Sequence, residues 1–119
     1  MKNNLYVLIS NELDPIYGAV QGGHAVAEWL LGHWQTERNK DFNEDYPKWD
    51  WTNDYLIYLS VDVEKWKKDL WRFSPSKYQW TWFDEPDLDN KTTAIAIYEK
   101  DFPGFIRRKL KQEKLLTGL

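Results

Sequence analysis

Residues 5–27 read LYVLISNELDPIYGAVQGGHAVA, and this stretch sets the expected fold. Its first five residues are apolar β-formers, which is typical of a strand buried on both faces of a sheet. Asp14 and Pro15 suit a helix N-cap and a first helical residue. Gly22 and Gly23 would weaken that helix unless another part of the chain comes close there. Apolar spacings of three and four predict about five helical turns, through Ile16, Val20, Gly23, Ala27, Leu30 and Trp34.

Further strands and helices are predicted along the rest of the chain. β-forming runs predict three more strands, and helical spacing with capping residues predicts two more helices. The segment at about 35–53 is polar and contains tryptophans, so it is expected to be a long loop, a kind of segment that is often functional. In chain order, the other elements are a strand at 55–60, a helix at 62–73, strands at 78–83 and 92–98, and a helix from about 102 to 114.

The order β-α-β-α-β-β-α predicts one α/β domain that spans residues 1–119. We expect three layers, α/β/α, around a mixed four-stranded sheet. A helix in each of the first two connections permits parallel pairing. The short connection before the fourth strand favours an antiparallel neighbour.

Composition excludes several classes of protein. The chain has 119 residues, of which 42% are apolar and 29% charged, as in a single globular domain. It has no cysteine, which excludes disulfide scaffolds, thiolate metal sites and cysteine nucleophiles. With only two histidines, a zinc site is not expected. No apolar run approaches the roughly 20 residues of a membrane span, so we expect a cytoplasmic protein without membrane contact.

The net charge is −3, so any contact with nucleic acid needs a local basic patch. Basic residues concentrate in the helices predicted at 62–73 and about 102–114. If both helices lie on one side of the domain, their cations form a patch that can neutralise phosphates. The alternative is that these are solvated helix faces. The candidate RNA-binding residues are Arg107, Arg108 and Lys111.

The strongest candidate site is the first strand-to-helix junction. Glu12 follows the carboxyl end of the first strand, where open α/β sheets place their ligands. Gln21 and His24 lie three residues apart on the following helix. A carboxylate, an amide and an imidazole could position a water and stabilise an oxyanion. The alternative is that Glu12 is a loop residue and His24 a core histidine.

A second candidate lies in the sequence Phe83-Asp84-Glu85-Pro86-Asp87-Leu88-Asp89, which holds four carboxylates within six residues. Clustered acids can bind a hard cation or raise one another's pKa for acid–base chemistry. Asp and Pro are also ordinary turn residues, and a solvated turn explains the run equally well.

Eight tryptophans in so short a chain are unusual. Because the indole N–H needs a hydrogen-bond partner, many of these side chains should be only partly buried. We interpret most of them as core and rim packing. The alternative is that a cluster of them forms a stacking or partner surface.

Two motifs together resemble the type-II (archaeal/eukaryotic-type) peptidyl-tRNA hydrolase family, and its short bacterial and phage relatives in particular. The helix motif Ala19-Val20-Gln21-Gly22-Gly23-His24-Ala25 is similar to the family pattern Ala-x-Gln-x-x-His-Ala. Phe83-x-Glu85-Pro86-Asp87-Leu88, followed by Thr93-Ala94-Ile95-Ala96, looks like the second pattern of the short relatives. The order of elements agrees over nearly the whole chain apart from the predicted loop.

The resemblance implies hydrolysis of the ester between a peptide and the tRNA 3′ ribose, without a metal or cofactor. A water would be held by Glu12 or by the Glu85/Asp87 turn. The carbonyl would be oriented by Gln21, Thr92 and Thr93, and His24 would brace the helix against the strand. Two positions depart from the family: Glu12 replaces its aspartate, and its helix-start lysines fall around the uncharged Ile16, Tyr17 and Gly18.

A binding function is the competing hypothesis. A relative that has lost catalysis could bind a small ligand or a protein through its tryptophan-rich surface. Trp49 and Trp51 are the candidate anchors for a protein partner. A third reading is a homodimer whose aromatic surfaces are the subunit interface.

Overall fold

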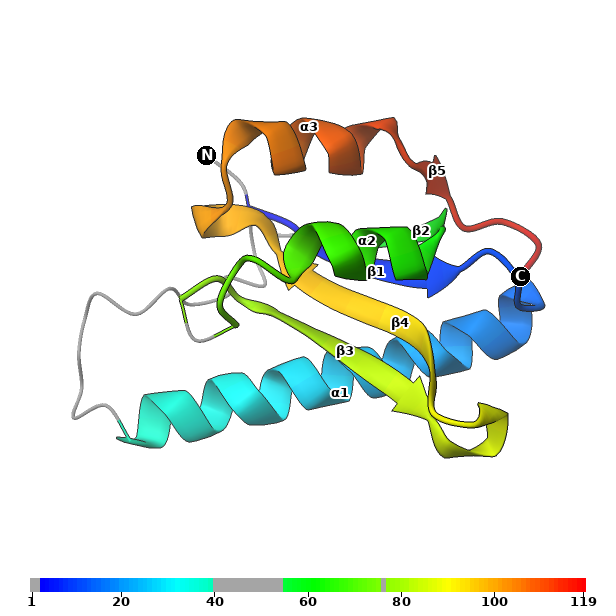
Figure 1. Cartoon of the computed structure of the whole chain (residues 1–119), viewed down its shortest axis with the longest axis horizontal. Helices are drawn as coiled ribbons and strands as arrows, with labels where there is room; N and C mark the ends of the chain where they lie inside the picture. Colours follow the sequence, from blue (N-terminus) through cyan, green and yellow to red (C-terminus); the bar gives the residue numbers. More distant parts are fainter. Residues whose placement is uncertain (1–2, 40–54, 76) are drawn as a thin grey trace.

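The computed structural model describes residues 3–39, 55–75 and 77–119, which form one mixed sheet and its helices (Figure 1). The sheet has five strands in the order β3-β4-β1-β2-β5. Its elements are β1 (Leu5–Ser10), α1 (Pro15–Asn39), β2 (Leu56–Val61), α2 (Val63–Leu70), β3 (Trp80–Glu85), the 3₁₀ turn η1 (Pro86–Leu88), β4 (Lys91–Tyr98), the 3₁₀ turn η2 (Glu99–Asp101), α3 (Gly104–Gln112) and β5 (Lys114–Leu115).

The strand directions bring several chain segments to one end of the sheet. β1 and β2 are parallel, whereas β4 is antiparallel to both β1 and β3. β1, β2 and β3 therefore point the same way, and β4 begins where they end. The predicted antiparallel pairing across the short third connection is confirmed.

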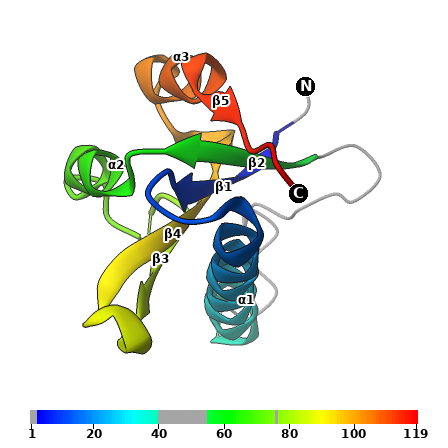
Figure 2. The same cartoon turned by 90° about the vertical axis from the view of Figure 1, so that its right-hand side faces the viewer.

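Helices cover both faces of the sheet, which confirms the three-layer expectation (Figure 2). Helix α1 packs on one face over a cluster that includes Val7, Ile9 and Trp29. Helices α2 and α3 pack on the other face over a larger cluster that includes Trp66 and Ile106. Alternate residues of β1 feed the two clusters, which is why this strand is apolar without interruption.

The start of α1 follows the predicted chemistry. Pro15 is the first helical residue, and the Asp14 side chain accepts the backbone N–H of Ile16 at 3.0 Å. The helix then continues to Asn39, beyond the predicted five turns, so residues 35–39 are helical and not part of a loop. The rest of the predicted loop, with Trp49 and Trp51, lies outside the described residues.

The prediction of four strands is wrong, because β5 is a fifth strand. The last helix was expected to reach Lys114 but ends at Gln112, and Glu113 is already extended. Lys114 and Leu115 then pair antiparallel with Ser60 and Leu59 of β2. Two residues carry no periodicity, so this strand is specified by the free edge of β2 and not by a local pattern.

The apolar stripe that predicted α1 does not face the sheet. Ile16 is 63% exposed and Val20 is 55% exposed. The buried face of the helix is made instead of Gly18, Gly22 and Ala25, together with Gln21 and, further along, Trp29. A Cβ on Gly22 would lie 2.6 Å from Ile9 Cδ1, so the glycines let the helix axis approach β1 closely.

The titration of Tyr6 should make the fold less stable at high pH. Burial raises the pKa of the Tyr6 hydroxyl above its ordinary 10.0; a hydrogen bond with Asn4 opposes the rise and the charge of Glu99 adds to it. As pH rises above about 10, the unfolded chain releases this proton before the folded chain does, so the free energy of unfolding falls.

We expect Tyr6→Phe to reduce that fall, measured by urea unfolding at about pH 8 and about pH 11. Burial also raises the pKa of Tyr58, so part of the alkaline loss should persist in the variant. An alkaline loss as large as in the wild-type protein would show that Tyr6 is not responsible.

Candidate functional site

The candidate site lies at the end of the sheet where β1 and β3 finish and β4 begins, on the right in Figure 1. Glu12 follows β1, and its carboxylate forms an ion pair with the Lys91 ammonium at the start of β4. The hydrogen bond with Glu12 and the charge of Glu12 raise the pKa of Lys91. An exposed ion pair of this kind contributes about 0–1 kcal/mol to stability. A ligand can therefore replace either partner of the pair at little cost in free energy.

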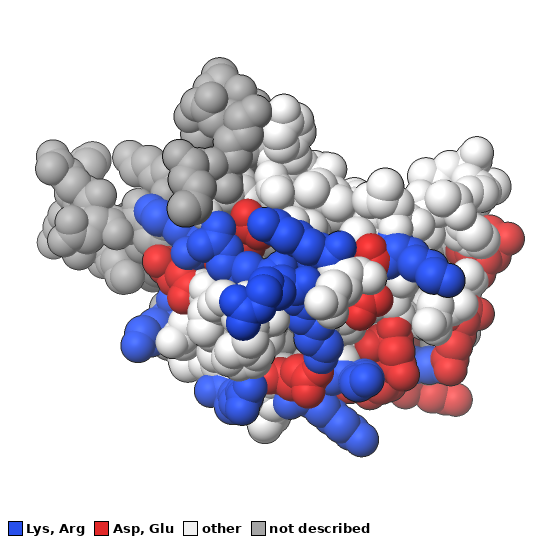
Figure 3. Space-filling view, turned by 90° about the horizontal axis from the view of Figure 1, so that it is seen from above, with Lys and Arg blue, Asp and Glu red and all other residues white. Residues whose placement is uncertain are grey.

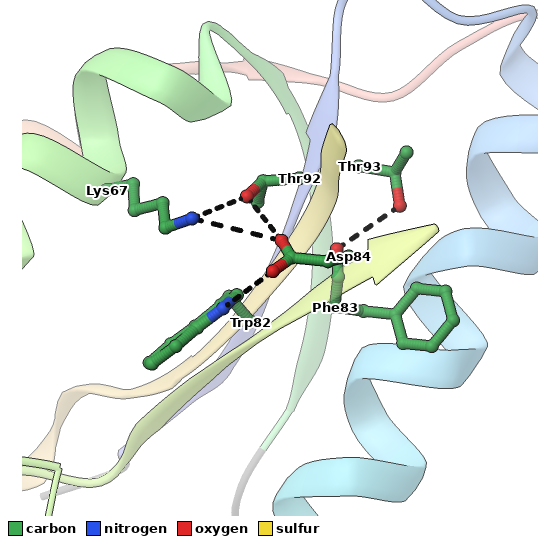
Figure 4. A network of polar contacts seen from close by, with 6 residues as sticks. All are labelled: Lys67, Trp82, Phe83, Asp84, Thr92 and Thr93. Atoms are coloured by element: carbon green, nitrogen blue, oxygen red, sulfur yellow. Dashed lines mark hydrogen bonds and ion pairs between the residues drawn. The ribbon is translucent and has the colours of Figure 1, made fainter. Parts of the chain in front are cut away.

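A second polar network lies beside this pair on the α2 side of the sheet (Figure 4). The Thr92 hydroxyl donates to Asp84 Oδ1 at 2.6 Å and accepts from Lys67 Nζ at 2.8 Å. Lys67 Nζ also lies 3.8 Å from Asp84 Oδ1, and the Trp82 indole N–H donates to Asp84 Oδ2 at 3.3 Å. The Lys67 ammonium and the Asp84 carboxylate are therefore both hydrogen-bonded to the Thr92 hydroxyl.

Local structure explains how Lys67 reaches this network. Asp62 caps α2, because its side chain accepts the backbone N–H of Lys65 at 3.2 Å. Val63, Trp66 and Leu70 bury one face of the helix against the sheet, which leaves Lys67 beside the start of β4. A helix is thus present where one was predicted at 62–73, with Asp62 as its cap, but it ends at Leu70, and residues 71–73 form a turn.

A β-bulge aims the threonines of β4. Phe83 pairs with Ala94 and Asp84 pairs with Thr92, so Thr93 has no partner residue in β3. Bulges of this kind occur often beside functional sites, where they redirect side chains. As a result, Thr92 joins the network with Asp84, while Thr93 points to the α1 side of the sheet.

On the α1 side, Thr93 and Gln21 join β4 to the helix. The Thr93 hydroxyl donates to Gln21 Oε1 at 2.7 Å, and Gln21 is only 2% exposed. The His24 ring stacks on Phe83 with 4.6 Å between centroids. These contacts connect residues far apart in sequence, and they fix α1 against the last part of β3 and the first part of β4.

The acidic turn after β3 contains one structural carboxylate and exposed ones. Glu85 is buried, and its Oε1 accepts the backbone N–H of Asp87 at 3.1 Å, which caps η1. Asp87 is exposed. Burial first, and then the charges of Glu85 and Asp87, raise the pKa of the Tyr17 hydroxyl on the first turn of α1.

The basic residues gather on the face formed by α2 and α3, which Figure 3 views directly. Helix α3 carries Arg107, Arg108, Lys109 and Lys111 and no acidic residue. Lys109 lies over the Trp66 ring and pairs with Asp69 of α2. Burial, followed by the positive charge of Lys65, lowers the pKa of Lys109, so cations of both helices lie close together.

The three predicted RNA-binding residues are not equivalent. The Arg107 guanidinium lies 3.7 Å from the carboxylate of the buried Glu99, so Arg107 compensates a buried charge. Arg108 and Lys111 are exposed on the same helix. The latter two are therefore better placed to meet phosphates than Arg107.

Sequence reasoning missed three charged residues of the site, Lys67, Asp84 and Lys91. Asp84 belongs to the acidic run but was not singled out, and Lys67 was one of several lysines on its helix. The signal for Lys91 was the short β3–β4 connection, because an antiparallel β4 must begin where its neighbours end. The positive charges at this end of the sheet come from α2 and β4.

In the part of the chain that the structure describes, no group of three or more His, Cys, Asp or Glu side chains could hold a metal ion. Within the same ranges, no helix is both long and apolar enough to cross a membrane. A search against protein-family models finds no match to this chain. A search of curated proteins likewise finds no significant similarity.

Proposed function

We propose that this end of the sheet hydrolyses the ester between a peptide and the 3′ ribose of tRNA. The observation that carries the proposal is that Lys67 and Asp84 meet on the Thr92 hydroxyl, at the same end of the sheet as the Glu12–Lys91 ion pair. These side chains lie where the two segments that resemble the peptidyl-tRNA hydrolase family come together. Ester hydrolysis needs a base for water and positive charge for the oxyanion, and both kinds of group are present.

The chemistry can be assigned to individual atoms. Glu12 takes a proton from a water as its oxygen attacks the ester carbonyl carbon. Lys67 stabilises the oxyanion that forms on the carbonyl oxygen, and the Thr92 hydroxyl, whose proton is donated to Asp84, accepts from the Lys67 ammonium and so orients it. The tetrahedral intermediate then expels the ribose oxygen, which receives the proton back from Glu12. Asp84 holds Thr92 and Lys67 in place, as a positioning residue.

The surroundings of the site support an RNA substrate. Although the net charge of the chain is −3, all charged residues of α3 are basic, and this helix lies on the same face of the sheet as α2. Arg108 and Lys111 would neutralise phosphates there, which a negatively charged chain can do only through such a local patch. The expected cytoplasmic location is where peptidyl-tRNA occurs.

A specific observation favours a binding module as the second candidate function. Ile16, Val20 and Leu31 are all exposed on the outer side of α1. Exposed apolar rows on a helix often mark a protein partner or a second copy of the chain. Such contacts are compatible with a hydrolase, so the activity assay decides between the two proposals.

The test is hydrolysis of a defined peptidyl-tRNA by the purified chain. Glu12→Gln should lower kcat by about 100- to 1,000-fold, because general-base catalysis contributes on this order. Asp101→Asn, an exposed carboxylate at the opposite end of the sheet, should leave the rate unchanged. Circular dichroism should report the same fold for all three proteins.

Two results would overturn the proposal. One is absence of turnover at high protein concentration together with absence of tRNA binding at low salt. The other is a Glu12→Gln protein as active as the wild-type protein. In the first case, the exposed face of α1 becomes the place to seek a partner.

A further inference from the structure

Trp71 stands out among the aromatic side chains of the described residues. It follows α2 directly and is 67% exposed, more than any other aromatic side chain whose burial is described. Its ring lies 5.9 Å from Trp82, which in turn lies 5.2 Å from Trp80. The three indoles form a row that begins in the core and ends in solvent.

The inner members of the row are fixed by hydrogen bonds. The Trp80 indole N–H donates to the Phe73 carbonyl at 2.8 Å, and the Trp82 indole N–H donates to Asp84. Trp71 therefore rests on an immobilised ring. Burying a base on such a pre-ordered surface loses little side-chain entropy, which favours binding.

Two positively charged side chains of this region lie over aromatic rings. Lys67 Nζ lies 5.5 Å from the centroid of Trp82. The Arg72 guanidinium lies 5.1 Å from the ring of Phe105, which is itself exposed. Aromatic rings interleaved with Lys and Arg are typical of surfaces that bind single-stranded nucleic acid, where rings stack bases and cations meet phosphates.

We propose that Trp71 and Trp82 stack an unpaired nucleobase of an RNA 3′ end, with the Arg72 guanidinium facing its phosphates. The charge of the surface selects a polyanion as the occupant, and the exposed indole selects a base in preference to a paired duplex. The hydrogen bond from Trp82 to Asp84 joins this platform to the network around Thr92. A terminal base stacked here would thus place its ribose ester near that network.

The identification of the RNA as a tRNA end rests on the proposed function, whereas base stacking does not require hydrolysis. The test uses two single-stranded RNA probes at low salt, one ending in CCA and one with an abasic terminal residue. Binding is followed by fluorescence anisotropy with the full-length protein. Trp71→Ala should weaken binding of the CCA probe by about 5- to 100-fold.

Three comparisons make the assignment specific. Trp71→Phe should restore most of the affinity, because Phe also stacks. Tyr55→Ala removes an exposed aromatic side chain just before β2 and should bind like the wild-type protein. The abasic probe should bind the wild-type protein and Trp71→Ala equally, because the stacked base is missing from both complexes.

The proposal is overturned if Trp71→Ala binds the CCA probe as well as the wild-type protein, or if it loses affinity equally for both probes. Failure of the platform and failure of the hydrolase proposal are distinguishable. Peptidyl-tRNA turnover whose KM is unchanged in Trp71→Ala rejects the platform alone. Base-dependent binding without turnover rejects hydrolysis and leaves a single-stranded RNA site.

Discussion

Lys67→Met should lower kcat for peptidyl-tRNA hydrolysis by about 100- to 1,000-fold while the chain keeps its fold. The ammonium of Lys67 is bonded to Thr92 Oγ1 at 2.8 Å and faces Asp84. Methionine keeps the apolar stem that packs beside Trp82 but removes the charge that would stabilise the oxyanion. Removing one such donor costs on this order in other hydrolases.

Lys100→Met is the matched control, since Lys100 is an exposed lysine in η2 at the far end of the sheet. It changes the net charge equally but should leave kcat as it is. Single-turnover rates at saturating protein separate kcat from any loss of RNA affinity. Equal, small effects of the two substitutions would remove Lys67 from the mechanism.

Gly22→Ala should destabilise the protein by about 1–3 kcal/mol, the usual cost of overpacking a core. A Cβ at this position would lie 2.6 Å from Ile9 Cδ1, 2.9 Å from Val7 Cγ1 and 3.0 Å from Tyr58 Cε2. Val7 is β-branched and central in β1, so its methyl group cannot rotate away freely. Relief therefore requires α1 to move off the sheet.

Gly23→Ala should do the opposite. A Cβ there meets nothing within 4 Å, so the substitution only removes backbone freedom from the unfolded chain. We expect a gain of about 0.4–1 kcal/mol. Urea unfolding of both variants measures the difference, and two changes of the same sign would contradict the close packing of α1 on β1.

The parts of the fold that follow from local chemistry could be predicted from the sequence. A few neighbouring residues were enough to predict β1, from its uninterrupted apolar run, and the start of α1, from the Asp14 cap followed by Pro15. The apolar stripe of α1 predicted a helix correctly but carried no information about which side packs. The packed side of α1 is decided by the close approach at Gly22, and this approach depends on residues of β1 and β2.

The candidate site was only partly predictable, because it is assembled from distant segments. The Gln21–Thr93 hydrogen bond and the Glu12–Lys91 ion pair each join residues more than 70 positions apart. Their meeting depends on the strand order β3-β4-β1-β2-β5, which no local pattern encodes. Glu85 illustrates the converse, since a residue in an acidic run proved to cap a turn.

The pairing of β5 with β2 also has a consequence for the order in which the chain can fold as it is synthesised. Leu116 donates its backbone N–H to Tyr58 at 3.0 Å, and its side chain packs against the α1-side cluster. All other strands precede this segment, so the outer edge of β2 stays open until residues 114–116 have left the ribosome. Among the described elements, the nascent domain thus carries an unpaired edge on β2 until residues 114–116 have been synthesised and pair with it.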